Sequence, residues 1–202
     1  MEPVILSTAR LDLRPFAPSD EDEVYAAVQD PDIQRWTMVP SPYARADAKT
    51  FVSERVPTGW REDTAYAFAV RLGAGGPLVA ALGVHVHTAF GEKLYEVGYW
   101  ATREHRGNGY VAEALDGVAR WAFTELGAVR LEWRAEVGNA GSRAVAEKAG
   151  FRFEGTLRAA LLRNGTARDC WIGALLPSDL GLTPALPHLP ARETGPAVGG
   201  AA

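Results

Sequence analysis

The segment from Arg103 to Tyr110 combines charged side chains with two glycines and leads directly into a stretch with helical periodicity. A turn at a helix N-terminus presents unpaired backbone N–H groups at the positive end of the helix dipole, and such a turn binds phosphate. Gly107 and Gly109 let the main chain approach an anion without a Cβ in between, and Arg106 adds a charged donor. The segment therefore predicts a site for a phosphorylated ligand of the nucleotide-cofactor type.

The spacing Gly107-x-Gly109-x-x-Ala112 also satisfies the fingerprint of a dinucleotide-binding βαβ unit. In that unit the first glycine follows almost directly on a buried strand. Here the charged run 102–106 separates Gly107 from the strand expected at 94–101. No series of parallel strand–helix units surrounds the motif, so the pattern argues against a dinucleotide fold.

The elements around this turn predict a mixed sheet covered by helices. Alternation or apolar runs predict strands at 8–14, 65–71, 78–88, 94–101, 129–135, 151–163 and 166–176, and helical spacing predicts helices at 20–28, 47–56, 111–126 and 139–149. Gly73 to Pro77 and Asn164-Gly165 read as hairpin turns. We therefore expect an α+β (mixed α/β) fold, with a mostly antiparallel sheet of about seven strands and helices on both faces.

Composition limits the remaining possibilities. The 202 residues, 47% of them apolar, suit one domain, expected at 1–176, with a Pro/Gly/Ala-rich C-terminal tail at 177–202 expected to be disordered. A single cysteine, Cys170, excludes a disulfide framework and is expected to fill the core. The chain shows no signal peptide or membrane span, which predicts a cytoplasmic protein without a membrane partner. The net charge of −4 argues against nucleic acid as a partner, so an anionic cofactor must find its cations locally.

The glycine turn resembles the pyrophosphate loop of the GNAT superfamily of acyl-CoA N-acyltransferases, Arg/Gln-x-x-Gly-x-Gly/Ala. Its counterpart here is Arg106-Gly107-Asn108-Gly109-Tyr110-Val111, in which Val111 replaces the usual small residue. Further segments resemble the RimJ/RimL-like branch, the ribosomal-protein-alanine N-acetyltransferase type, and occur in its order between residues 8 and 176. They are Thr8-Ala9-Arg10-Leu11-Asp12-Leu13-Arg14-Pro15, Glu96-Val97-Gly98-Tyr99-Trp100, Gly109-Tyr110-Val111-Ala112-Glu113-Ala114-Leu115, Asn139-x-x-Ser142 and Gly150-Phe151-Arg152-Phe153-Glu154-Gly155.

The resemblance implies the GNAT fold and an N-acetyltransferase that moves an acetyl group from acetyl-CoA to a primary amine, by direct attack in a ternary complex and without a metal. The acceptor would be a small-molecule amine or a protein N-terminal amine, and homodimers occur in this branch. In the family, main-chain groups at the end of the strand before the loop pair with pantetheine. The implied cofactor-binding residues are Trp100, Ala101, Thr102, Arg106, Gly107, Asn108, Gly109, Tyr110, Val111 and Asn139.

Two side chains are candidates for the proton transfers of such a reaction. Glu96 lies in a hydrophobic strand two residues from Gly98, which leaves space in front of it, and it is the candidate general base. An ion pair or a solvated carboxylate is the alternative, with water or a histidine then acting as base. Ser142 shares a helical stripe with apolar Val145 and Ala149, so it should face inward and could protonate the leaving thiolate.

Two expected residues of the family are missing, which supports a second hypothesis. Ala146 stands where many GNAT enzymes carry a tyrosine, and the run 159–162 lacks a glutamate found in some RimL-like enzymes. The chain could therefore be a catalytically weak acyl-CoA-binding sensor or regulatory module. His85 and His87 share a strand face but lack a third ligand at suitable spacing, so we expect no metal.

Overall fold

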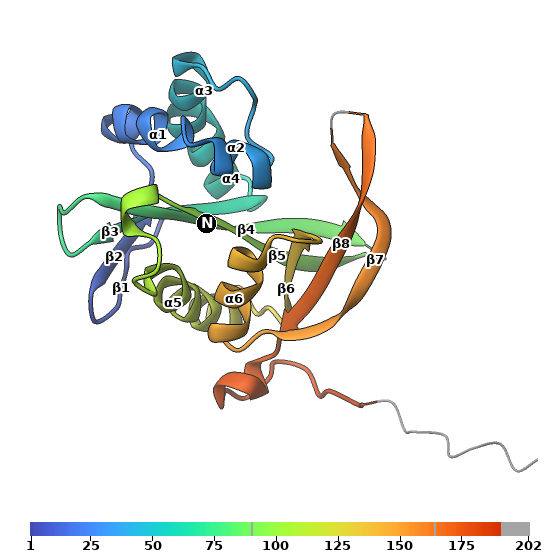
Figure 1. The fold of residues 1–202 in the computed structure, drawn as a ribbon. Helices are drawn as coiled ribbons and strands as arrows, with labels where there is room; N and C mark the ends of the chain where they lie inside the picture. Colours follow the sequence, from blue (N-terminus) through green and yellow to red (C-terminus); the bar gives the residue numbers. More distant parts are fainter. Residues whose placement is uncertain (90, 164, 191–202) are drawn as a thin grey trace, which may run out of the picture.

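A twisted eight-stranded sheet separates two groups of helices (Figure 1). The computed structural model describes residues 1–89, 91–163 and 165–190. The strands are β1 (Leu6–Ser7), β2 (Leu11–Pro15), β3 (Ala65–Leu72), β4 (Leu78–Ala89), β5 (Glu92–Ala101), β6 (Leu131–Glu136), β7 (Arg152–Arg163) and β8 (Thr166–Leu175). Their order is β1-β2-β3-β4-β5-β6-β8-β7, and β5–β6 is the parallel pair in an otherwise antiparallel sheet. The predicted mixed fold is confirmed, with the two-residue β1 as an additional strand.

The helices lie on both faces of the sheet, as predicted (Figure 1). One face carries α1 (Glu21–Val28), α2 (Pro31–Trp36), α3 (Arg45–Thr50) and α4 (Val56–Arg61), and the other carries α5 (Tyr110–Thr124) and α6 (Ala140–Lys148). The single helix expected at 47–56 is wrong in detail, because a π-helical turn, Phe51–Arg55, joins α3 to α4. Pro57 follows it and cannot donate a backbone hydrogen bond, so the helical ladder is interrupted at this point.

The core forms where the predicted apolar faces meet. The α5 stripe is buried as expected, at Val111, Ala114, Leu115, Val118 and Ala122. Rings from α4, β3 and α5 form an aromatic cluster of Trp60, Tyr66, Phe68 and Trp121, with centroids 5.1 to 5.9 Å apart. Such contacts bury large apolar areas and hold the two helical layers to the sheet. Cys170 is a buried free cysteine in β8.

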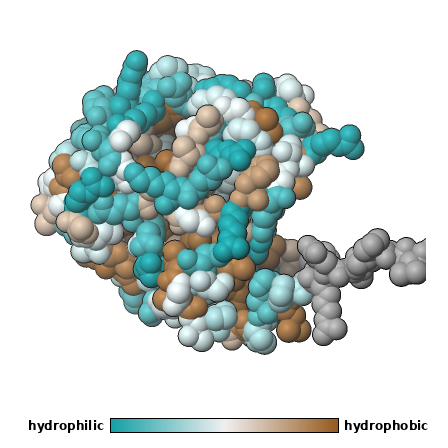
Figure 2. All heavy atoms as spheres, turned by 60° about the horizontal axis from the view of Figure 1, so that its bottom comes forward, coloured by the Kyte–Doolittle hydropathy of each residue, from teal (hydrophilic) through white to brown (hydrophobic). Residues whose placement is uncertain are grey.

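The outer surface and the C-terminal segment add little to the site. In the view of Figure 2, hydrophilic side chains cover much of the surface, with apolar ones scattered among them.

Pro177–Leu180 forms a short 3₁₀ helix after β8, and Leu182 packs against the core, so the first part of the predicted tail is structured. Residues 191–202 of that tail lie outside the described range. No helix among the described residues is both long and apolar enough to cross a bilayer.

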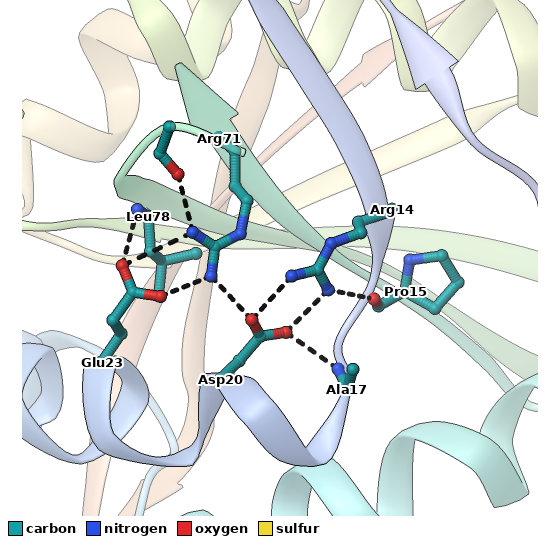
Figure 3. A network of polar contacts seen from close by, with 8 residues as sticks. Arg14, Pro15, Ala17, Asp20, Glu23, Arg71 and Leu78 are labelled. Carbon is teal, nitrogen blue, oxygen red and sulfur yellow. Dashed lines mark hydrogen bonds and ion pairs between the residues drawn. The ribbon is translucent and has the colours of Figure 1, made fainter. Parts of the chain in front are cut away.

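A buried ion network ties the first helices to the sheet (Figure 3). The Asp20 side chain is 1% exposed and accepts bonds from two Arg14 nitrogens at 2.7 Å, from Arg71 Nη2 at 2.6 Å and from the Ala17 N–H at 2.8 Å. Glu23 of α1 also binds Arg71. Burial alone would raise the pKa of Asp20, but these hydrogen bonds, led by that from Arg14, lower it below its usual value. The sequence pattern predicted only that a helix begins at about Asp20.

We predict that Asp20→Asn lowers the free energy of unfolding by about 3 kcal/mol, because the substitution removes the buried counter-charge of Arg14 and leaves Arg71 with Glu23 alone. Urea unfolding at pH 7 measures the effect. The matched control is Asp22→Asn, since Asp22 is 83% exposed and pairs with Arg45 in solvent; it should cost less than about 1 kcal/mol.

The pH dependence follows from the lowered pKa of Asp20. The stabilisation is present above the unfolded pKa of about 3.9 and is lost as the pH falls through the lower folded pKa. The difference between wild type and Asp20→Asn should therefore shrink in acid. Equal losses for Asp20→Asn and Asp22→Asn at pH 7 would contradict this account.

Candidate functional site

A continuous cleft of about 980 Å³ passes between the two helical layers, through the middle of the sheet. Its lining residues come from α2 and the loop after it, the segment from α3 to α4, the central strands β3 to β6, the glycine turn, the start of α5, α6 and β7. Most of the sequence-predicted site residues border this cleft. They are Glu96, Trp100, Ala101, Arg106, Gly107, Gly109, Tyr110, Val111, Asn139 and Ser142.

The cleft opens where two parallel strands stop pairing. β5 pairs with β6 from Tyr95, opposite Leu131, only as far as Val97, opposite Trp133. On its other side, β5 stays paired with β4 up to Ala101. The stretch 98–101 therefore has one edge that no strand covers, and its polar main-chain groups need other partners. A ligand lying beside this stretch can supply them.

The glycine turn has the geometry that its sequence predicts. Gly107 and Gly109 have φ values of 81° and 78°, in the left-handed region that favours glycine, and Gly109 directly precedes α5. The N-terminus of a 15-residue helix is thus aimed at the cleft. Thr102 and Asn108 do not border the cleft: Thr102 bonds to Val79 O and His105 Nδ1, and Asn108 donates to the carbonyls of His105 and Arg106. Both side chains hold the shape of the turn.

The Arg106 side chain is engaged in a contact that the sequence did not reveal. Its guanidinium lies 2.8 Å from Asp30 Oδ2 and 3.1 Å from Asp32 Oδ2, at the start of α2. Asp30 also caps α2, because its Oδ1 accepts the Asp32 N–H at 2.9 Å. The turn is therefore tied to the start of α2. Trp36, at the other end of α2, also borders the cleft.

Ser142 is the centre of a small polar group on the α6 side of the sheet. Its Oγ accepts the Trp133 Nε1–H at 2.9 Å and lies 3.3 Å from the Tyr99 hydroxyl. Tyr99 in turn donates to the Ser142 carbonyl at 2.8 Å, and burial raises the pKa of this phenol, which keeps it protonated at neutral pH. Asn139 accepts the Ser142 N–H at 3.1 Å and caps α6, as its spacing predicted. Ser142 thus faces inward, as expected.

Glu96 faces the opposite side of the sheet from Tyr99, because the two differ in strand parity. Its Oε2 lies 3.6 Å from Arg134 Nε and 3.7 Å from His87 Nε2. Burial raises the pKa of Glu96, and Arg134 and His87 only partly oppose the rise. His85 stands directly across on β4, and its pKa is lowered by burial and then by His87. A partly desolvated carboxylate and a neutral imidazole therefore face this side of the cleft.

The space in front of Gly98, expected from the sequence to be open beside Glu96, is occupied by His85. A Cβ added to Gly98 or to Gly83 would lie 3.6 Å from His85 Nε2, an ordinary van der Waals distance, so the imidazole lies directly over both backbone positions. The neighbouring side chains of β3 and β4 on this face are also small, at Ala65, Ala67 and Ala81. Larger residues there would narrow the floor of the cleft on the side of the N-terminal helices.

Three side chains at the cleft were not predicted as site residues. Tyr99 and Trp133 bond the Ser142 hydroxyl, and Lys148 of α6 lies with its Nζ 3.1 Å from where a Gly109 Cβ would be. Spacing could have indicated Lys148, because it shares a helix face with Gly141 and Ala144. No group of three His, Cys, Asp or Glu side chains in the described part of the chain is arranged to hold a metal ion.

Comparisons with known proteins agree with this geometry. Residues 10–152 match the model of the acetyltransferase (GNAT) domain. The chain is 33% identical over 133 residues to the "Putative ribosomal N-acetyltransferase YdaF" of Bacillus subtilis, covering 65% of this chain and 72% of that protein. It is 26% identical over 165 residues to the uncharacterized N-acetyltransferase YoaA of B. subtilis, covering 82% and 92%. Mycobacterium smegmatis RimJ, solved in complex with CoA-disulfide, superposes with a TM-score of 0.77 at 24% identity, over 91% of this chain and 93% of RimJ.

We predict a measurable energetic coupling between Arg106 and Asp30. A double-mutant cycle with Arg106→Met and Asp30→Ala, measured by urea unfolding, should give about 1 kcal/mol, because the Asp30 carboxylate is only 8% exposed. The cycle cancels the loss of the α2 cap. The matched cycle with Asp32→Ala should give less, since the Asp32 side chain is 67% exposed. Coupling of Arg106 to Asp30 indistinguishable from zero would mean that the tie between turn and α2 contributes nothing.

Proposed function

Because the chain belongs to the GNAT acetyltransferase family, as an N-acetyltransferase of the RimJ/RimL-like branch, we propose that it moves an acetyl group from acetyl-CoA to a primary amine by direct attack in a ternary complex. The family membership confirms the resemblance seen in the loop motif and the ordered segments. The observation that carries the proposal is the position of Glu96 and Ser142, which approach the uncovered edge of β5 from opposite faces of the sheet.

The cofactor is proposed to lie on the α5–α6 side. Backbone amides of the turn 106–111 and the N-terminus of α5 would bind its pyrophosphate. The uncovered main chain of Trp100 and Ala101 would pair with the pantetheine arm, and an amide there would bind the thioester oxygen. Asn139 stands at the start of α6, beside Ser142. The RimJ structure, which holds a CoA-disulfide, supports this placement by its fold.

The two proton transfers are proposed to take place on opposite faces of the sheet, at the point where β5 and β6 stop pairing. Glu96 would take a proton from the acceptor ammonium, directly or through water, since a raised pKa makes a carboxylate a better base. Ser142 would donate to the departing thiolate. Trp133 already donates to the Ser142 oxygen, and the Ser142 O–H donates to the Tyr99 hydroxyl at 3.3 Å. In the reaction the Ser142 proton would turn from Tyr99 to the thiolate, and Tyr99, kept protonated by burial, would turn its own proton from the Ser142 carbonyl to the serine oxygen.

The acceptor is proposed to enter from the side of the N-terminal helices. That part of the cleft has a mostly apolar wall of Trp36, Met38, Val39, Tyr43 and Phe51, above the small residues of the sheet. The relationship to YdaF, named a putative ribosomal N-acetyltransferase, supports a ribosomal protein as the acceptor, and we propose that its N-terminal amine reacts in the cytoplasm. A small-molecule amine would use the same entrance.

A thiol-release assay with acetyl-CoA across a panel of N-terminal peptides and small amines tests this function. Wild type should release CoA with at least one acceptor. Glu96→Gln and Ser142→Ala should each lower kcat by about a hundredfold while CoA still binds, because each removes one proton transfer. Gly109→Trp should abolish CoA binding together with turnover, because its side chain fills the turn.

The control for Glu96→Gln is Glu92→Gln, an exposed carboxylate at the start of the same strand, which should leave kcat unchanged. Tight CoA binding by wild type with no turnover on the whole panel would favour the sensor hypothesis. Full activity in Glu96→Gln would remove Glu96 as the base and leave His85 or water.

The proposed base also predicts a pH profile. Glu96 must be deprotonated to act, and its pKa is raised by burial, so kcat/KM should rise with pH through a value above the usual carboxyl pKa of about 4.3. Because the acceptor is proposed to react from its ammonium form, kcat/KM should fall again above the acceptor's own pKa, about 7.7 to 8.0 for an α-amino group. Without the base, Glu96→Gln should use only the free amine, so its kcat/KM should lack the lower limb and rise through the acceptor's pKa. Survival of the lower limb in that variant would assign it to another group.

A further inference from the structure

The cations near the glycine turn differ in how far they are already neutralised. Arg106 carries one positive charge but lies against two carboxylates, Asp30 and Asp32, so this group of three has a net charge of −1. Arg10 also approaches the turn, yet Glu113 binds it at 2.6 Å. Neither guanidinium is free to compensate the charge of a phosphorylated cofactor.

Lys148, unlike these arginines, lies close to the turn without being part of an ion pair among the described residues. Its Nζ lies 3.1 Å from where a Gly109 Cβ would be, at the N-terminus of α5, and its side chain borders the cleft. None of the ion pairs found among residues 1–89, 91–163 and 165–190 includes Lys148; its neighbour Glu147 is paired with Arg143 instead. The ammonium therefore adds an uncompensated positive charge to the positive end of the helix dipole.

The position of Lys148 along α6 also suits a ligand that reaches from the turn to Ser142. Gly141, Ala144 and Lys148 recur at helical spacing and all border the cleft. Gly141 and Ala144 are small and leave room for a ligand along α6, and the Lys148 ammonium lies at the C-terminal end of this helix. Ser142 and Lys148 are six residues apart, or about 9 Å along the axis. The reacting end and the charged end of one extended ligand can thus lie on the same helix.

We propose that Lys148, and not Arg106, is the side chain that neutralises the cofactor's phosphates, and that Arg106 serves to hold the turn to α2. The inference rests on the proposed function, because it takes a phosphorylated acyl carrier as the ligand. The recognised chemistry is a phosphate group placed between the amides of the turn and an ammonium from α6.

Binding of CoA and of pantetheine, which lacks every phosphate of CoA, separates a phosphate contact from a general disturbance of the cleft. The variants are Lys148→Met, Arg106→Met and the control Lys93→Met, an exposed lysine at the far end of β5. Isothermal titration should show that Lys148→Met raises the Kd for CoA about tenfold, as the loss of one charge-assisted hydrogen bond implies, and leaves the Kd for pantetheine unchanged. Lys93→Met should change neither.

Arg106→Met should alter the two Kd values by the same factor, because it disturbs the position of the turn and not a phosphate contact. The proposal is overturned if Lys148→Met binds CoA within twofold of wild type, or if it loses CoA and pantetheine equally. It is also overturned if Arg106→Met selectively loses CoA. A wild-type protein that binds neither ligand would instead refute the proposed function, which distinguishes the two failures.

Discussion

The site depends on the point at which β5 and β6 stop being a pair. Parallel pairing ends at Val97 and Trp133, while β4 continues to hold β5 as far as Ala101. A four-residue edge in the middle of a sheet is thereby left without a strand partner, and backbone groups in such a position require hydrogen bonds from elsewhere. The same divergence lets side chains from both faces of the sheet reach one cleft. The turn that begins α5 follows shortly after this edge, so a ligand that pairs with the main chain would also reach the backbone amides of that turn.

The net charge of the protein does not show which of its cations are already paired with carboxylates. The protein carries a net charge of −4, and much of its arginine is used to hold elements together. Arg14 and Arg71 bind the buried Asp20 and fasten the first helices to β2 and β3, and Arg106 fastens the turn to α2. Breaking the pairs of the buried Asp20 is costly, and Arg106 already lies against two carboxylates, so these arginines are poor candidates for exchange with a ligand. In the proposed binding mode, an anionic ligand therefore uses backbone amides and a cation outside this framework.

The sequence was most informative where structure is local. Alternation and helical spacing identified the strands and helices, the glycine turn and the Asn139 cap, because each depends on neighbours within a few residues. It was least informative where partners are distant: Arg106 meets Asp30 and Asp32 76 and 74 residues away, and Tyr99 meets Ser142 43 residues away. The end of the β5–β6 pairing is likewise a matter of long-range register, which the apolar pattern of either strand does not encode. Alternation along β5 is enough to place Glu96 and Tyr99 on opposite faces, but the partners of each side chain became known only from the structure.

The position of Tyr99 on the α6 face of β5 also bears on Ala146, where the family resemblance leads one to expect a tyrosine. In the proposed reaction the acid must reach the thiolate on the α6 side, and Ala146 has no group to do so. Here a tyrosine hydroxyl arrives from β5 instead, at Tyr99, and meets α6 through Ser142. The helix then needs only a small hydroxyl, held by the Trp133 indole, to complete a chain of donors into the cleft. In the proposed reaction, Tyr99 acting through Ser142 would therefore take the part of the tyrosine that the family resemblance leads one to expect at Ala146.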